Sequence, residues 1–235
     1  MLSLISTPIG NLDDISLRAI DVIKSADFIY TEDTRSFKKI LDSIECKKKC
    51  KSFHEHNEDI ICKEIIKHLK NKKHVVLSCE AGTPAISDPG YKLIRECLNL
   101  NLKYTLIPGP SSLINAVVLS GLPTDKFSFY GFIPKKNNAQ KKLFQKVSND
   151  QKTAIMFESV KRLRKTIISI SKHLDNNRYI SVCREMTKIH EQIVQGNCEH
   201  LLKKIDDGSL PLKGEIVHVI EGNSSNNTNI KLDNK

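Results

Sequence analysis

Residues 78–90 read Ser78-Cys79-Glu80-Ala81-Gly82-Thr83-Pro84-Ala85-Ile86-Ser87-Asp88-Pro89-Gly90. They follow the apolar run 74–77 and precede the helix-like segment 91–98, so a loop rich in glycine and proline lies at a strand-to-helix corner. Open α/β sheets bind ligands at such corners, beyond the carboxyl ends of their strands. The two glycines allow the backbone to approach a ligand, and Thr83, Ser87 and Asp88 offer polar groups. The loop therefore predicts a site for a small polar ligand.

The first half of the chain alternates between strand-like and helix-like segments. Strands are predicted over 2–6, 28–30, 75–77 and 104–107, and helices over 15–24, 37–44, 93–100 and 113–119. The spacing of Ile61, Ile65, Ile66 and Leu69 predicts a further helix, with Asn57 as its N-cap. This alternation is typical of a parallel sheet covered by helices.

Two more corners of this kind are the segments 7–11, Thr-Pro-Ile-Gly-Asn, and 108–112, Pro-Gly-Pro-Ser-Ser. Each alone is more often structural than functional, and the second resembles the first turn of a helix. Together with residues 80–90 they place three loops after neighbouring strands, so a parallel sheet would bring them to one crevice.

The second half has a different pattern. Strands are predicted over 127–132, 154–157, 179–182, 189–194 and 216–220, with helices over 139–148, 160–174 and 197–205. Closely spaced strands favour a mixed or antiparallel sheet. The fold class predicted is α/β in two domains, 1–112 and 113–222, with a ligand cleft between them. The Asn-rich segment 223–235 is expected to be disordered.

Composition limits the function classes. The chain has 235 residues, 39% of them hydrophobic, and no apolar run near the roughly 18 residues that cross a bilayer. We therefore expect a cytoplasmic protein without a membrane segment or leader. The seven cysteines form no CxxC pair, which suits a reducing compartment. A zinc site at Cys46, Cys50, His54 and His56 fits no common ligand spacing and faces many lysines, so no metal is predicted.

The net charge is +10 and the pI is about 9.2, which favours an anionic partner. The alternative is a solvated lysine-rich surface in a chain biased towards Lys, Asn and Ile. Neither a GxxxxGK[ST] phosphate loop nor a GxGxxG dinucleotide motif occurs, so neither of these phosphate-binding modes is expected.

Seven segments together resemble a known family. They are TPIGNLDDISLRA, EAGTPAISDPG, IPGPSS, GLPTDKFSFYGFIPKK, FES at 157–159, CREMTKIHE at 183–191 and KGEIVHVIEG at 213–222. The order and spread of these motifs resemble the tetrapyrrole-methylase superfamily. The resemblance is greatest to its bacterial members that methylate a cytidine ribose 2′-hydroxyl in the decoding region of 16S ribosomal RNA.

The resemblance implies S-adenosyl-L-methionine as methyl donor and a homodimer. Carried over motif by motif, the donor contacts are Pro8, Gly82, Thr83, Ile86, Ser111 and Ser112, with Phe157, Glu158, Met186 and Thr187 from the second domain. Two departures stand out. Family members usually carry aspartate where this chain has Glu80, and longer relatives have a helical region after the strand at 216–220.

Methyl transfer from a sulfonium needs alignment and exclusion of water, while the alcohol needs a proton acceptor. The candidates are Asp88, Glu158, Glu185, Lys188 and Glu191, of which Glu191 and Lys188 are predicted to lie near the acceptor. The alternatives are structural: Glu185 would pair with Lys188, and Glu158 would orient the turn at Ser159.

Basic residues after residue 132 predict RNA contacts. The predicted set is Lys135, Lys136, Lys141, Lys142, Arg162 and Arg164, together with Lys161 and Lys165. A base would stack on Tyr130 or Phe132 if either ring were exposed, and burial is the alternative. A further cluster at Arg35, Lys38 and Lys39 has a solvated helix face as its alternative.

The leading hypothesis is therefore a ribosomal RNA ribose methyltransferase acting on 16S RNA or the small ribosomal subunit. One rival keeps the fold and donor but takes a tetrapyrrole such as uroporphyrinogen or a precorrin. The other is a non-catalytic RNA-binding assembly factor, for which Glu80 is the visible hint.

Overall fold

The computed structural model describes residues 1–223, and the chain divides into two compact units that meet between Ser112 and Leu113. The segment expected to be disordered lies outside the described residues, apart from its first residue, Asn223. Each unit has its own sheet, and the two are described separately.

The first unit is a five-stranded sheet in which every strand pairing is parallel. Its strands are β1 (Leu2–Ile5), β2 (Phe28–Thr31), β3 (Cys50–Ser52), β4 (Val75–Ser78) and β5 (Tyr104–Ile107), in the order β3-β2-β4-β1-β5. The helices are α1 (Leu17–Ser25), α2 (Thr34–Ser43), α3 (Glu58–Lys70) and α4 (Tyr91–Asn99), with a short 3₁₀ turn at Leu12–Asp14. The predicted parallel sheet is confirmed.

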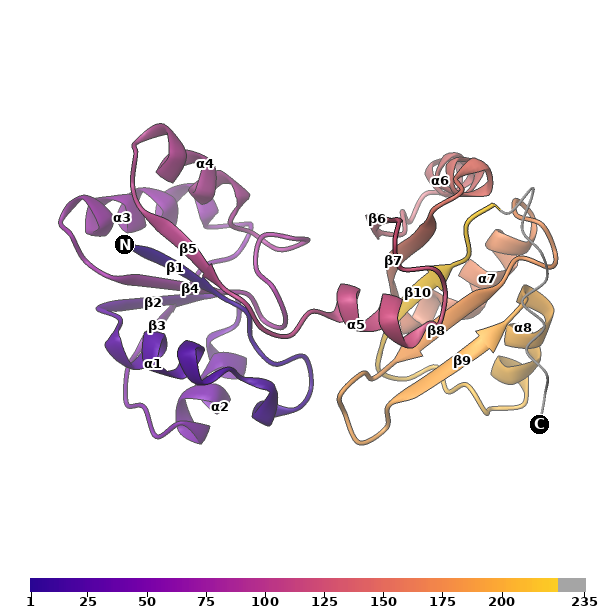
Figure 1. The fold of residues 1–235 in the computed structure, drawn as a ribbon, viewed down its shortest axis with the longest axis horizontal. Coiled ribbons are helices and arrows are strands. Elements are labelled where there is room, and N and C mark those ends of the chain that lie inside the picture. Colours follow the sequence, from indigo (N-terminus) through magenta and orange to yellow (C-terminus); the bar gives the residue numbers. More distant parts are fainter. Residues whose placement is uncertain (224–235) are drawn as a thin grey trace. The chain divides into compact units, whose positions relative to one another are not determined.

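Helices cover both faces of this sheet (Figure 1). On one face Leu4 and Leu77 pack with Ile65 of α3 and Leu93 of α4. On the other, Ile5, Ile29 and Val76 pack with residues of α1 and α2, including Ile23 and Phe37. Burial on both faces explains why the central strands read as continuous apolar runs.

Two local features of this unit differ from what the sequence predicts. The short edge strand β3 was not predicted, because its three residues, Cys50, Lys51 and Ser52, show no apolar alternation. Asn57 does hold the N-cap position of α3, but its side chain does not cap the helix. Its Oδ1 accepts from His54 N at 2.9 Å and its Nδ2 donates to Ser52 O at 3.1 Å, so the amide closes the preceding turn.

The second unit holds a mixed five-stranded sheet, as predicted. Its strands are β6 (Phe127–Phe132), β7 (Thr153–Ser159), β8 (Ile180–Arg184), β9 (Gln192–Gly196) and β10 (Glu215–Ile220), in the order β6-β7-β10-β8-β9. Only β6 and β7 pair in parallel. The helices are α5 (Ser112–Leu119), α6 (Asn137–Asn149), α7 (Leu163–Ser171) and α8 (Cys198–Asp206), with a 3₁₀ turn at Val160–Arg162.

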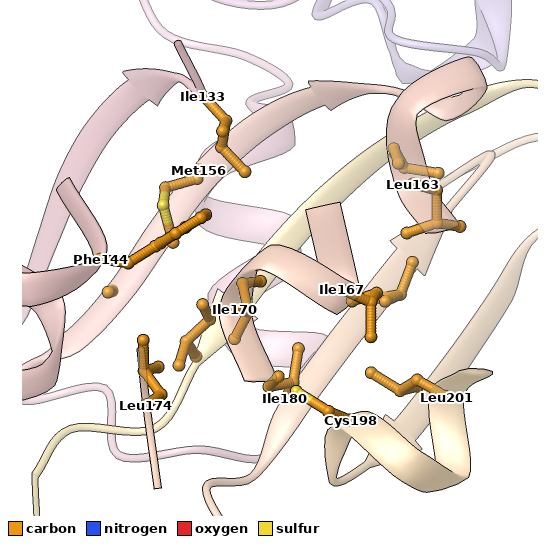
Figure 2. Close-up of a cluster of buried hydrophobic side chains, with 14 of the residues drawn as sticks. Ile133, Phe144, Met156, Leu163, Ile167, Ile170, Leu174, Ile180, Cys198 and Leu201 are labelled. Carbon is orange, nitrogen blue, oxygen red and sulfur yellow. The ribbon is translucent and has the colours of Figure 1, made fainter. Parts of the chain in front are cut away.

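One hydrophobic cluster joins α6, α7 and α8 to this sheet (Figure 2). Phe144, Ile167, Ile170 and Leu201 from the helices pack with Met156 of β7 and with residues of β8 and β10. The opposite face of β8 is met by α5, where the Cys183 thiol donates to the Ala116 carbonyl across 3.7 Å.

The strand predicted at 189–194 begins three residues later. Ile189 is 98% exposed in the turn before β9, and Glu185 and Thr187 in the same turn have positive φ. The segment 160–174 is a 3₁₀ turn followed by α7 and not one helix. The apolar residues Ile189 and Val160 both belong to turns. The local hydrophobic pattern does not distinguish such a turn residue from a residue of the adjacent strand or helix.

Candidate active site

Three loops meet at the carboxyl edge of the first sheet. They follow β1, β4 and β5, which are adjacent in the strand order, so the predicted convergence is confirmed. Beyond the strands, Thr7 and Gly82 form an isolated antiparallel bridge, with Thr7 N 2.9 Å from Gly82 O and Gly82 N 3.0 Å from Thr7 O.

The Thr83 hydroxyl ties all three loops together. Its Oγ1 lies 3.1 Å from Ser6 Oγ and donates to Pro110 O across 3.3 Å. Gly109 packs so closely that a Cβ there would lie 3.1 Å from the Cβ of Ser6. Gly82 has φ +81°, and a Cβ there would lie 3.3 Å from Ile9 Cγ2. The glycines are therefore required where the loops touch one another.

The predicted donor residues of this unit differ in accessibility. Pro8 and Gly82 are buried, whereas Thr83, Ser111 and Ser112 are half-buried and Ile86 is 55% exposed. The first two therefore shape the loops, and the other four have side-chain surface for a ligand. Beside them the Thr7 hydroxyl is fully buried, and within residues 1–223 it has no hydrogen-bond partner.

Acidic groups adjoin these loops. Glu32 directly follows β2, and its Oε2 accepts from the amide of Glu80 at 3.3 Å. Burial raises the pKa of Asp88, and burial together with the nearby Asp88 charge raises the pKa of Glu32. Sequence reasoning missed Glu32, although its place after a parallel strand was a usable signal. Glu80, which stands where family members usually carry aspartate, is exposed.

In the second unit Glu158 is held by its own neighbours. Its Oε1 accepts from Ser159 N at 2.7 Å and its Oε2 from Thr166 Oγ1 at 2.6 Å, with Arg162 3.3 Å away. The structural alternative, orientation of the turn at Ser159, is thus observed. Arg162 also donates to the carbonyls of Ile133 and Pro134 at 3.1 and 2.7 Å. Its guanidinium therefore holds the chain between β6 and α6.

The turn 185–191 contains both predicted catalytic residues. Lys188 Nζ lies 2.9 Å from Glu185 Oε1 and 3.0 Å from Glu215 Oε2, so the predicted pairing with Glu185 is confirmed. Burial lowers the pKa of Lys188, but the bonds to these carboxylates outweigh it and the pKa lies above its usual value. Glu191 Oε2 accepts from Thr187 N at 2.7 Å. Met186, a predicted donor contact, is buried, and Thr187 is half-buried.

The predicted RNA-binding lysines are all on the surface. Lys135, Lys136, Lys141 and Lys142 are exposed at the start of α6, whereas Arg164 forms an ion pair with Asp206 at 2.9 Å. The excess charge is uneven. Residues 113–223 carry 18 Lys and Arg against 11 Asp and Glu, while residues 1–112 carry 17 against 15. Most of the net positive charge of residues 1–223 therefore belongs to the second unit.

Three general features of residues 1–223 bear on the kind of site that the chain holds. No group of three His, Cys, Asp or Glu side chains in that range is placed to hold a metal ion. No helix there is long and apolar enough to cross a membrane. The seven cysteines are free thiols.

Comparison with known proteins gives both the fold and the family. Residues 1–202 match the family described as tetrapyrrole (corrin/porphyrin) methylases. Two solved structures share the fold: a uroporphyrin-III-C-methyltransferase from Thermus thermophilus (TM-score 0.64, 12% identity, 94% of this chain and 93% of that chain) and a diphthine synthase (TM-score 0.71, 16% identity, 94% and 89%).

Closer relatives are bacterial proteins named ribosomal RNA small subunit methyltransferase I. The one from Rickettsia prowazekii is 42% identical over 94% of this chain and 78% of its own length. The one from Thermotoga maritima is 38% identical over 94% and 98%. The chain therefore belongs to the tetrapyrrole (corrin/porphyrin) methylase family, in its ribosomal RNA small subunit methyltransferase I group.

Proposed function

We propose that the chain uses S-adenosyl-L-methionine to methylate the 2′-hydroxyl of a cytidine ribose in the decoding region of 16S ribosomal RNA. The observation that carries this proposal is the 42% identity to a named small-subunit RNA methyltransferase over 94% of the chain. The excess of basic residues in the second unit supports it, because an RNA substrate is a polyanion.

The loops after β1, β4 and β5 fit a donor with polar groups. The buried Thr7 hydroxyl lacks a partner within residues 1–223, and Thr83, Ser111 and Ser112 in the same loops are only half-buried. Ile86 offers an exposed apolar side chain next to these groups. We propose that Pro8 and Gly82 shape this loop cluster and do not contact the donor through side chains, because both residues are buried. Phe157, Glu158, Met186 and Thr187 remain proposed donor residues of the second unit.

When bound, the donor supplies a methyl group already activated by its sulfonium. The chain must then exclude water and accept the proton that the ribose hydroxyl releases. We assign the proton acceptor to Glu191, whose carboxylate is exposed in the turn before β9. Lys188 keeps its proton because of Glu185 and Glu215, so its role is that of a fixed cation beside the anionic acceptor.

The acceptor RNA is proposed to contact Lys135, Lys136, Lys141 and Lys142, which are exposed at the start of α6. Arg162 and Arg164 are engaged with protein acceptors, so their share in RNA binding is proposed to be smaller. The family resemblance further supports a homodimer in the cytoplasm.

The test is transfer of a labelled methyl group to small ribosomal subunits prepared from a strain lacking this modification. We expect the label on a ribose in the decoding region. Transfer to a porphyrinogen in place of RNA would establish the tetrapyrrole rival. Donor binding without transfer to either substrate would point to the assembly factor.

A further inference from the structure

Three phenylalanine rings gather on one face of the second sheet. Phe129 and Phe132 of β6 both meet Phe157 of β7 edge to face, with ring centroids 4.9 and 5.4 Å apart. Phe132 is nevertheless 63% exposed. The Phe132 ring therefore contributes little to the core, and much of its surface is available for a contact.

A bulge in the edge strand β6 produces this arrangement. Phe129 is paired with Ile155 and Phe132 with Phe157, so three steps along β6 match two along β7. Gly131, within the bulge, has φ +68°, a conformation that favours glycine. Because side chains alternate along a regular strand, the extra residue puts Phe132 on the same face as Phe129.

The residues that follow Phe132 are basic and exposed. The chain continues through Ile133 and Pro134 to Lys135 and Lys136 at the start of α6. Arg162 donates to the Ile133 and Pro134 carbonyls. These bonds fix the backbone that links the exposed ring to the two lysines. The neighbouring Tyr130 is engaged within the protein: its hydroxyl donates to Asp150 at 2.9 Å and Lys146 lies over its ring.

An exposed aromatic ring beside cations is the combination that binds single-stranded nucleic acid, with bases on the ring and phosphates on the lysines. We propose that Phe132, supported by Phe157, is a stacking surface for an unpaired base of the RNA substrate, with Lys135 and Lys136 on adjoining phosphates. This inference rests on the proposed RNA methylation and identifies a single-stranded segment as the part of the RNA that is recognised.

The absence of tryptophan from the chain permits a direct test. Phe132→Trp places the only tryptophan of the variant at the proposed surface, where its emission can be excited selectively. We expect a short single-stranded oligoribonucleotide to quench it. The matched control is Phe127→Trp, at the other end of β6 and 37% exposed, which we expect to be unaffected.

A second measurement separates stacking from charge. Phe132→Ala should weaken oligoribonucleotide binding by about 5- to 100-fold, the scale of one lost base stack, without changing the salt dependence. Phe132→Tyr should keep most of the affinity. Circular dichroism melting of each variant checks the fold.

Two results would overturn the inference. One is RNA binding that leaves the Phe132→Trp emission and the Phe132→Ala affinity unchanged. The other is an emission change that depends on protein concentration alone, because a second copy would then cover the ring. These outcomes leave the methyltransferase assay on wild-type protein untouched. Conversely, quenching by RNA with no methyl transfer would keep the stacking surface and refute the proposed function.

Discussion

Thr7 and Gly82 hold each other through two main-chain hydrogen bonds of 2.9 and 3.0 Å, beyond the last paired residues of β1 and β4, Leu4 and Leu77. The loops of two parallel strands are thus joined in antiparallel fashion at the edge of the proposed donor site. This bridge makes the backbone of Gly82 part of a fixed wall of that site.

Gly82→Ala should lower both stability and donor affinity. Its φ of +81° and the Cβ position 3.3 Å from Ile9 Cγ2 together impose a cost of about 1–3 kcal/mol. The control is Gly121→Ala, where φ is +63° and no atom of the described part of the chain lies within 4 Å of the added carbon. Chemical unfolding and calorimetry with S-adenosyl-L-homocysteine measure the two effects. Equal donor affinity in both variants would contradict a role for Gly82 in the site.

The pH dependence of methyl transfer is expected to differ according to whether Glu191 or Asp88 accepts the proton. If Glu191 accepts the proton, Glu191→Gln removes the acidic limb of the rate profile and Asp88→Asn does not. The raised pKa of Asp88 predicts an acidic limb above the ordinary carboxyl range if that residue acts instead. Single-turnover rates of both variants across pH decide between them.

The same raised pKa predicts a stability effect at Asp88. A carboxyl whose pKa is higher when folded stabilises the protein at low pH and loses that contribution as pH rises through the folded pKa. Asp88→Asn should therefore increase the free energy of unfolding at neutral pH. A decrease would show that the charged carboxylate has a favourable partner in the folded state.

The burial of His218 predicts that the protein loses stability in mild acid. Its side chain is fully buried in β10, neither ring nitrogen has a hydrogen-bond partner among residues 1–223, and burial lowers its pKa from 6.5 to about 4. The unfolded chain binds the extra proton between these values, so about 3 kcal/mol of stability is lost as pH falls from 6.5 to 4. His218→Leu should flatten this part of the stability profile. Urea unfolding at several pH values measures the change.

Lys135→Glu with Lys136→Glu should weaken binding to small subunits and reduce its salt dependence while leaving donor affinity unchanged. The matched control changes Lys67 and Lys70 to glutamate. These two exposed lysines lie on α3, in the first unit, which is nearly neutral. Filter binding at several salt concentrations gives both slopes. Identical slopes in the two double variants would show that charge acts without regard to position.

Much of the fold could be predicted because its strands are short apolar runs joined by glycine- and proline-rich corners. β4 is buried throughout, and its sequence shows this directly. The edge strand β3 could not be predicted, since its pairing with β2 depends on a distant segment and not on its own residues. The late start of β9 has a similar cause, because only tertiary context shows that Ile189 faces solvent.

The site was predictable in its loops and less so in its side chains. Glycine and proline identified the three corners, but whether Thr83 or Glu158 faces a ligand depends on partners that lie outside each motif. Thr83 bonds to Pro110 and Glu158 to Thr166, and neither contact has a local sequence signal. The exposure of Phe132 likewise depends on a bulge that the sequence shows only as one glycine among aromatics.

The separation of the hydrophobic clusters has a consequence for synthesis of the protein. Both clusters of the first sheet are built from residues 2–107, and the cluster of the second from residues 133–220. A nascent chain on the ribosome thus contains every strand of its first sheet before the second has been translated. The N-terminal half is able to fold during elongation, so slow folding of the C-terminal half need not delay it.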